Sequence, residues 1–305
     1  MMIQAVLSNP NHPEYGVATI PFPIPRGQYA HCMELLEALE IGDAVKADCK
    51  VEKIDSFYTV LKRTEMLTVN VEELNYLAKR LDGFDTGEAA QFQAMAHKLE
   101  LFELKDLINL TFCCQQATVI TDFSDLSAVG RNHYMNLHGG CAKTEELDAL
   151  DGEKTARQLI ENGNGAVTPY GVVYDNGMKL EQVYDGRFFP CYYYEPNAIT
   201  VAVTSKSEPE DTEHITWLYL PMVQEEIDRA LLRGGITDPA DVRLRLEDSQ
   251  LPNEVDVLLD IEYETLSDLN ELASATDGLS KADMEKLGAV VMLAKPKSAA
   301  QIKNL

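Results

Sequence analysis

The most constraining feature of this sequence is a pattern that occurs twice. Residues 73–78 (ELNYLA) match residues 268–273 (DLNELA). Two later pairs keep the same offset: Asp82-Gly83 with Asp277-Gly278, and Asn109-Leu110 with Asn304-Leu305. A register held over such a span is hard to obtain by chance, and it indicates two diverged copies of one unit.

The segments upstream of these matches agree in outline. The first copy reads AVLSNPNHPE and then VATIPFPIP, and the second reads AVTSKSEPED and then ITWLYLP. A chain of 305 residues is long enough for two or three domains. We therefore predict an α+β protein, an elongated chain of small α/β domains in which two diverged copies of one unit, 1–110 and 198–305, flank a middle domain, 111–197.

Each unit should contain the same order of elements. A short strand leads into a proline-rich loop, and a second strand ends at Pro25 or Pro221. An amphipathic helix follows, over 222–234 in the second copy. A longer strand and two helices complete the unit, with the Asp-Gly pair stopping the first of these helices.

The middle segment has weaker signals. Residues 112–120 are expected to form a strand, and 122–136 a helix with Asp122 or Ser124 as its N-cap. Short strands are also predicted around three groups of residues: Val172-Val173-Tyr174, Phe188-Phe189 and Tyr192-Tyr193-Tyr194.

The charge balance is unusual, with 50 Asp and Glu against 26 Lys and Arg, a formal net charge of −24. Such a field repels nucleic acid and anionic membranes, so an electrostatically recruited partner should be basic. Six cysteines provide no disulfide framework, the start has no signal peptide, and no run reaches the roughly 18 apolar residues of a membrane span. We expect a cytoplasmic protein.

The acidic excess is concentrated in one segment. Between Arg245 and Lys281 there are ten acids and no Lys or Arg. Within it, apolar residues from Val255 to Tyr263 alternate with carboxylates from Glu254 to Glu264, which predicts a strand with one buried and one acidic face. Like charges in a row repel one another, and a row without cations resembles the field of a nucleic-acid backbone.

Nine residues of this segment are the candidate partner-binding carboxylates, acting as phosphate mimics: Glu247, Asp248, Glu254, Asp256, Asp260, Glu262, Glu264, Asp268 and Glu271. The alternative is a solvated strand face whose acids provide solubility and protect an edge. A calcium site is a weak interpretation, because the chain has no D-x-[DN]-x-[DN]-G loop.

The signals for catalysis or metal binding are poor. His133, His138 and Cys141 lie close in sequence, and Cys113-Cys114 could fold near them, but no C-x-x-C or H-x-x-x-H pair anchors a zinc site. A Cys141 nucleophile with His138 lacks an identifiable third group. Walker A, G-x-G-x-x-G, G-x-S-x-G and H-E-x-x-H motifs are absent. We predict a protein that is not an enzyme, without metal or cofactor.

Several segments resemble a known family. The stretch VNVEELNYLAKRLDGFD resembles the ArdA antirestriction proteins of conjugative elements. The stretches INLTFCCQQATVITDFSDL, VTPYGVVYDNGMKLEQVYDGRFFPCYYYEP and ITWLYLP look like those of an enlarged ArdA-like group carried by gut Firmicutes. The resemblance implies an elongated, usually dimeric protein whose carboxylates imitate bent B-form DNA and occupy the DNA groove of type I restriction-modification enzymes.

Three hypotheses follow. The leading one is a DNA-mimic inhibitor of a restriction-modification or similar DNA-binding defence enzyme, whose binding should weaken as salt rises. The second is an acidic adaptor or structural protein of a conjugative element without DNA mimicry, whose binding should be apolar and insensitive to salt. The third is a cysteine hydrolase or zinc enzyme centred on His138 and Cys141.

Overall fold

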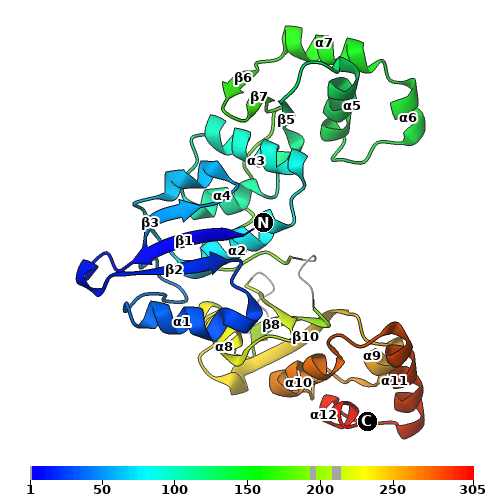
Figure 1. Cartoon of the computed structure of the whole chain (residues 1–305). Coiled ribbons are helices and arrows are strands. Elements are labelled where there is room, and N and C mark those ends of the chain that lie inside the picture. The colour runs from blue at the N-terminus through cyan, green and yellow to red at the C-terminus, as the bar shows by residue number, and fades with distance from the viewer. Residues whose placement is uncertain (1, 193–196, 208–213) are drawn as a thin grey trace. The chain divides into compact units, whose positions relative to one another are not determined.

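The computed structural model describes residues 2–192, 197–207 and 214–305 and shows a mixed α+β fold (Figure 1). It contains three small antiparallel sheets, with strand orders β2-β1-β3-β4, β5-β7-β6 and β10-β8-β9. The α+β class predicted from the sequence is therefore confirmed. The chain divides into two compact units, one made of 1–25 and 32–185 and the other of 26–31 and 186–305.

The first unit begins with the four-stranded sheet. Its central strand β1 buries Ile3, Ala5 and Leu7 on one face, the alternation expected of a strand with one face in the core. The strands are β1 Ile3–Ser8, β2 Val17–Phe22, β3 Cys49–Asp55 and β4 Thr68–Val69, and the helices of this part of the chain are α1 Tyr29–Glu37, α2 Val71–Asp82, α3 Thr86–Lys98 and α4 Leu104–Leu110. Short 3₁₀ helices lie at η1 Pro13–Tyr15, η2 Arg26–Gln28 and η3 Thr59–Thr64.

The same unit contains the second sheet and three helices. These elements are η4 Cys114–Gln116, β5 Thr118–Ile120, α5 Leu126–Leu137, α6 Thr144–Ala149, α7 Gly152–Asn162, β6 Ala166–Thr168 and β7 Gly171–Tyr174. Helices α5 and α7 approach each other closely at two glycines. A Cβ atom on Gly130 would lie 1.9 Å from the carbonyl oxygen of Gly152, so this crossing requires glycine.

The sequence prediction for this region was right only in part. The strand expected over 112–120 is reduced to Thr118–Ile120, because residues 114–116 form η4. Helix α5 begins at Leu126, and its N-cap is Asp125, whose side chain accepts a hydrogen bond from Ala128 N. Phe188-Phe189 lies outside the strands, and Tyr193-Tyr194 lies outside the described residues.

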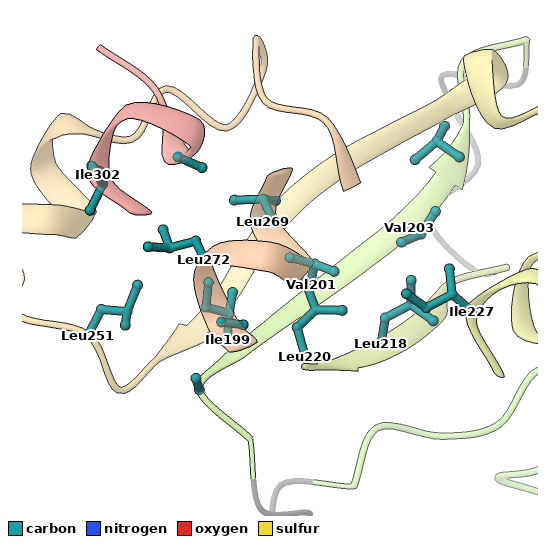
Figure 2. Packing of buried hydrophobic residues seen from close by; sticks show 14 of the residues in the cluster. Ile199, Val201, Val203, Leu218, Leu220, Ile227, Leu251, Leu269, Leu272 and Ile302 are labelled. Carbon is teal, nitrogen blue, oxygen red and sulfur yellow. The ribbon is translucent and has the colours of Figure 1, made fainter. Parts of the chain in front are cut away.

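The second unit contains the third sheet. Its elements are β8 Ile199–Ser205, β9 Thr216–Leu220, α8 Gln224–Arg233, η5 Pro239–Asp241, β10 Val242–Ser249, α9 Asn253–Leu258, α10 Leu266–Thr276, α11 Lys281–Ala294 and α12 Ala299–Lys303. Figure 2 shows its core, in which Ile199 and Val201 of β8 face Leu269 and Leu272 of α10. Ile302 of α12 belongs to the same buried cluster.

The two units share an order of elements. In each, the first strand is central and pairs antiparallel with the second and third, as β1 does with β2 and β3, and β8 with β9 and β10. The N-caps of the last three helices fall at positions matched by the sequence offset: Asn70 with Thr265, Asp85 with Ser280, and Glu103 with Ser298.

One long-range hydrogen bond occurs in both units at matching positions. Asn75 of α2 accepts from the backbone N–H of Ile24 through Oδ1 at 2.8 Å. Asn270 of α10 accepts from the backbone N–H of Met222, also at 2.8 Å. Each amide therefore ties the chain that leaves the second strand to the same turn of the same helix. Of the described residues, no helix is long and apolar enough to cross a membrane.

Candidate carboxylate surface

The acidic strand predicted over 254–264 is not present. Residues 253–258 form helix α9, in which the Pro252 carbonyl accepts from the N–H groups of Val255 (2.8 Å) and Asp256 (3.3 Å). The expected buried face also fails, because Val257 is 75% exposed and Tyr263 is 82% exposed. Val255, Leu258 and Leu259 face the core instead, at the i, i+3 and i+4 spacing of a helix.

The long strand of this unit is β10, just before the acidic segment. Its apolar residues alternate with an outward row of Arg243, Arg245 and Glu247. Arg245 pairs with Glu247 at 3.3 Å. The exposed face of this strand therefore carries both signs of charge, and the carboxylates beyond it lie on helices and loops.

The nine candidate carboxylates differ in exposure. Five are exposed: Glu247, Asp248, Asp260, Glu262 and Glu271. Four are partly buried: Glu254, Asp256, Glu264 and Asp268. All nine thus retain access to solvent to some degree, but they do not form a single regular row.

Several of these carboxylates have structural roles within the unit. Glu264 accepts from the backbone N–H of Ala299 through both oxygens, each at 3.1 Å, which satisfies a free donor at the start of α12. Asp268 accepts from the hydroxyl of Thr265, the N-cap of α10, at 2.6 Å. Glu271 pairs with Lys303 across α10 and α12. These three side chains would have to break internal bonds in order to bind a partner fully.

The other exposed or half-exposed acids are free of such bonds. Asp248, Glu254, Asp260 and Glu262 make no side-chain hydrogen bond or ion pair with the part of the chain that the structure describes. We call these four residues the unpaired carboxylates. They have no basic residue near them in sequence, because no Lys or Arg lies between Arg245 and Lys281.

Asp256 is the most strained acid of the segment. Its Oδ1 atom is buried and has no hydrogen-bond partner among the described residues. Burial raises the pKa of Asp256, the negative charge of Asp248 adds to the rise, and a hydrogen bond from Ser249 opposes it. Burial likewise raises the pKa of Glu264, with smaller contributions from Asp268 and Asp260 and an opposing hydrogen bond from Ala299.

The raised pKa of Asp256 leads to a prediction about stability. The folded protein holds this proton more tightly than the unfolded chain does, so stability is lost as the pH rises through the interval between the two pKa values. Asp256→Asn should therefore raise the thermal midpoint by about 1–3 °C at neutral pH, and the gain should vanish towards about pH 4. Melting curves across this range test it, with exposed Asp260→Asn as the control. A midpoint lowered at neutral pH would contradict the prediction.

The histidines and cysteines considered for catalysis have ordinary surroundings. His133 Nδ1 lies 2.9 Å from Thr118 Oγ1, and burial lowers the pKa of His133. His138 bonds to the backbone oxygen of Tyr134 at 2.7 Å and stacks on its ring. Cys141 is exposed, whereas burial raises the pKa of Cys114. Across the described ranges, no three His, Cys, Asp or Glu side chains are grouped so that they could hold a metal ion.

Sequence reasoning missed the apolar residues that the structure leaves exposed in this unit. They are Val257 and Tyr263 in the acidic segment and Val290, Met292 and Leu293 on α11. A signal was available for α11: its sequence, KADMEKLGAVVMLA, is apolar on more than one face of a helix. The segment that carries the unpaired carboxylates thus also carries apolar contact area.

No protein-family model matches this chain, and no curated protein matches its sequence.

Proposed function

We propose that this chain is a DNA-mimic antirestriction protein of the ArdA type, which binds a type I restriction-modification enzyme or a similar DNA-binding defence enzyme and inhibits it competitively. The observation that carries the proposal is the set of unpaired carboxylates, which lie in a segment with ten acids and no cation. A basic DNA groove is the natural partner of such a surface, because its Lys and Arg side chains are placed to meet phosphates.

The mimicry we propose uses scattered carboxylates in place of a regular strand. A phosphate row on bent DNA is itself curved, so helix ends and loops are as suitable as a strand for presenting charges. Exposed ion pairs contribute only about 0–1 kcal/mol each, so the affinity must come from many of them together. The net charge of −24 supplies that number and would also steer the approach to a basic groove.

We also propose that the two halves descend from one duplicated unit. The matched N-caps, the shared strand order and the paired Asn75 and Asn270 bonds support this. A duplication would present the acidic surface on one copy while the other copy retains the ancestral packing. The chain would then belong to an enlarged branch of the antirestriction proteins carried by conjugative elements.

One observation favours a second candidate function. Val257 and Tyr263 are largely exposed beside Asp256 and Glu262, and exposed apolar side chains of this size are typical of contact surfaces between proteins. An acidic adaptor or structural protein of a conjugative element would use them without imitating DNA. Salt separates the two functions, since apolar binding would persist at ionic strengths that weaken charge pairing.

Competition for DNA tests the proposal. The purified protein is titrated into a type I restriction-modification enzyme bound to labelled duplex DNA, at low and at high salt. DNA mimicry predicts displacement at low salt that weakens strongly as salt rises. Failure to displace DNA at either salt would overturn DNA mimicry for this class of enzyme. Displacement that is equal at both salts would favour apolar binding instead.

A further inference from the structure

Helix α11 of the second unit is the counterpart of helix α3 of the first. Their N-caps, Asp85 and Ser280, occupy matched positions, and both helices follow an Asp-Gly turn. Matching the two helices residue by residue pairs Gln91 with Lys286, Met95 with Val290, and Lys98 with Leu293. In each helix these three positions are spaced i, i+4 and i+7, so they lie on one face.

That face is covered in the first unit. Helix α3 contacts β5, β6 and β7. Gln91 Nε2 donates to the carbonyl of Ala117 at 2.6 Å, and Lys98 pairs with Asp175 at 2.6 Å. Met95 is fully buried. The three-stranded sheet and its loops therefore form a cover over α3.

The matching face of α11 is bare. Leu293 is 86% exposed, and Val290 is also exposed. The same holds for Met292, next to this face and paired with His97 of α3. Two polar residues of the covered helix, His97 and Lys98, are thus replaced by apolar ones on the bare helix, the reverse of what exposure to water favours.

Helices α10 and α12 show what the second unit does with a face that stays in water. Tyr76 and Ile108, buried in the first unit, are matched by Glu271 and Lys303, which form an exposed ion pair. There the chain has replaced apolar side chains by charged ones. The apolar face of α11 has not been changed in this way, which indicates that something covers it.

We propose that a second copy of this chain covers this face, so that the protein pairs with itself through α11 and the adjoining α9. Charge is the reason for choosing this occupant. Residues 281–303 carry five lysines against two acids, whereas the segment 247–277 carries ten acids and no base. Because α9 packs beside α11, a two-fold pairing can place the acidic segment of each copy against the lysines of the other.

The acidic segment also offers the apolar contacts that such a pairing needs. Val257 and Tyr263 are exposed between its carboxylates, and Val290 and Leu293 are exposed between lysines. Each half of the surface is thus apolar at its centre and oppositely charged around it. Local pairing of this kind would oppose the repulsion between two chains of net charge −24.

Sedimentation equilibrium over a concentration series tests the proposal on the full chain. We expect a monomer–dimer equilibrium. Leu293→Lys should raise the dissociation constant roughly 100-fold, because each copy loses a buried leucine and gains a charge at the interface. Lys286→Glu should also weaken the dimer, by about tenfold, because it sets a carboxylate against the acidic segment.

Two matched variants in the first unit control for general effects. Val167 is 84% exposed on β6, so Val167→Lys makes the same kind of change as Leu293→Lys away from the proposed interface. Lys62→Glu makes the same charge change as Lys286→Glu at an exposed position. Both should leave the dimer intact. A wild-type chain that stays monomeric, or a dimer unaffected by Leu293→Lys, would overturn the pairing.

The pairing does not depend on DNA mimicry. A dimer that displaces no DNA would leave the α11 interface standing and reject the proposed function. A monomer that displaces DNA in a salt-sensitive way would do the opposite.

Discussion

Neutralising the four unpaired carboxylates together should weaken binding to the proposed enzyme roughly 100-fold at low salt. The variant combines Asp248→Asn, Glu254→Gln, Asp260→Asn and Glu262→Gln, which change charge at nearly constant shape. None of the four makes a side-chain hydrogen bond or ion pair with the rest of the described chain, so the fold should be retained. The measurement is the concentration needed to displace labelled duplex DNA, compared with wild type.

A matched variant separates local mimicry from net charge. Glu145, Glu146, Asp148 and Glu161 are exposed acids of the first unit. Their neutralisation as Gln, Gln, Asn and Gln removes the same four charges, and it should reduce displacement by less than about threefold. Each single neutralisation within the unpaired set should have a small effect. Equal losses in the two fourfold variants would show that total charge, and not the acidic segment, determines binding.

Gly130→Ala should have the largest effect on stability. The added Cβ atom would meet the Gly152 carbonyl at 1.9 Å, and a backbone atom within a helix cannot move aside as a flexible side chain can. We expect a loss of about 3 kcal/mol or more, because α5 and α7 must separate to accept the methyl group. Amide hydrogen exchange should report lost protection in both helices, and a thermal melt should show a lower midpoint.

Gly27→Ala provides the comparison for this prediction. No atom lies within 4 Å of the Cβ position at Gly27, and its backbone does not have a positive φ. This substitution should change the midpoint little. Unchanged protection of α5 and α7 in Gly130→Ala would mean that the two helices can move apart without loss, contrary to their close crossing.

The sequence predicted the elements whose signals are local. The Asp277-Gly278 pair separates α10 from α11, as expected, and the repeat register placed the helices of both units correctly. The segment 254–264 was predicted wrongly because it fits two periods. Val255 and Leu259 belong equally to an alternating strand and to a helix face, and six residues are too few to distinguish them.

The candidate site was less predictable, because its state depends on residues that are distant in sequence. Glu264 is occupied by the amide of Ala299, and Glu271 is paired with Lys303. Neither partner lies within the acidic segment. Composition could show that the segment lacks cations, but only folding determines which carboxylates remain free for a partner.

The outer edge of β10 has a consequence for how the protein behaves in concentrated solution. In the sheet order β10-β8-β9, this strand has a neighbour on one side only among the described residues. An open edge can template the addition of foreign strands and lead to fibrils, and long charged side chains are a common deterrent. Arg243 and Arg245 place such cations along it in a chain where cations are scarce. Replacing both by valine would leave an apolar edge open to aggregation.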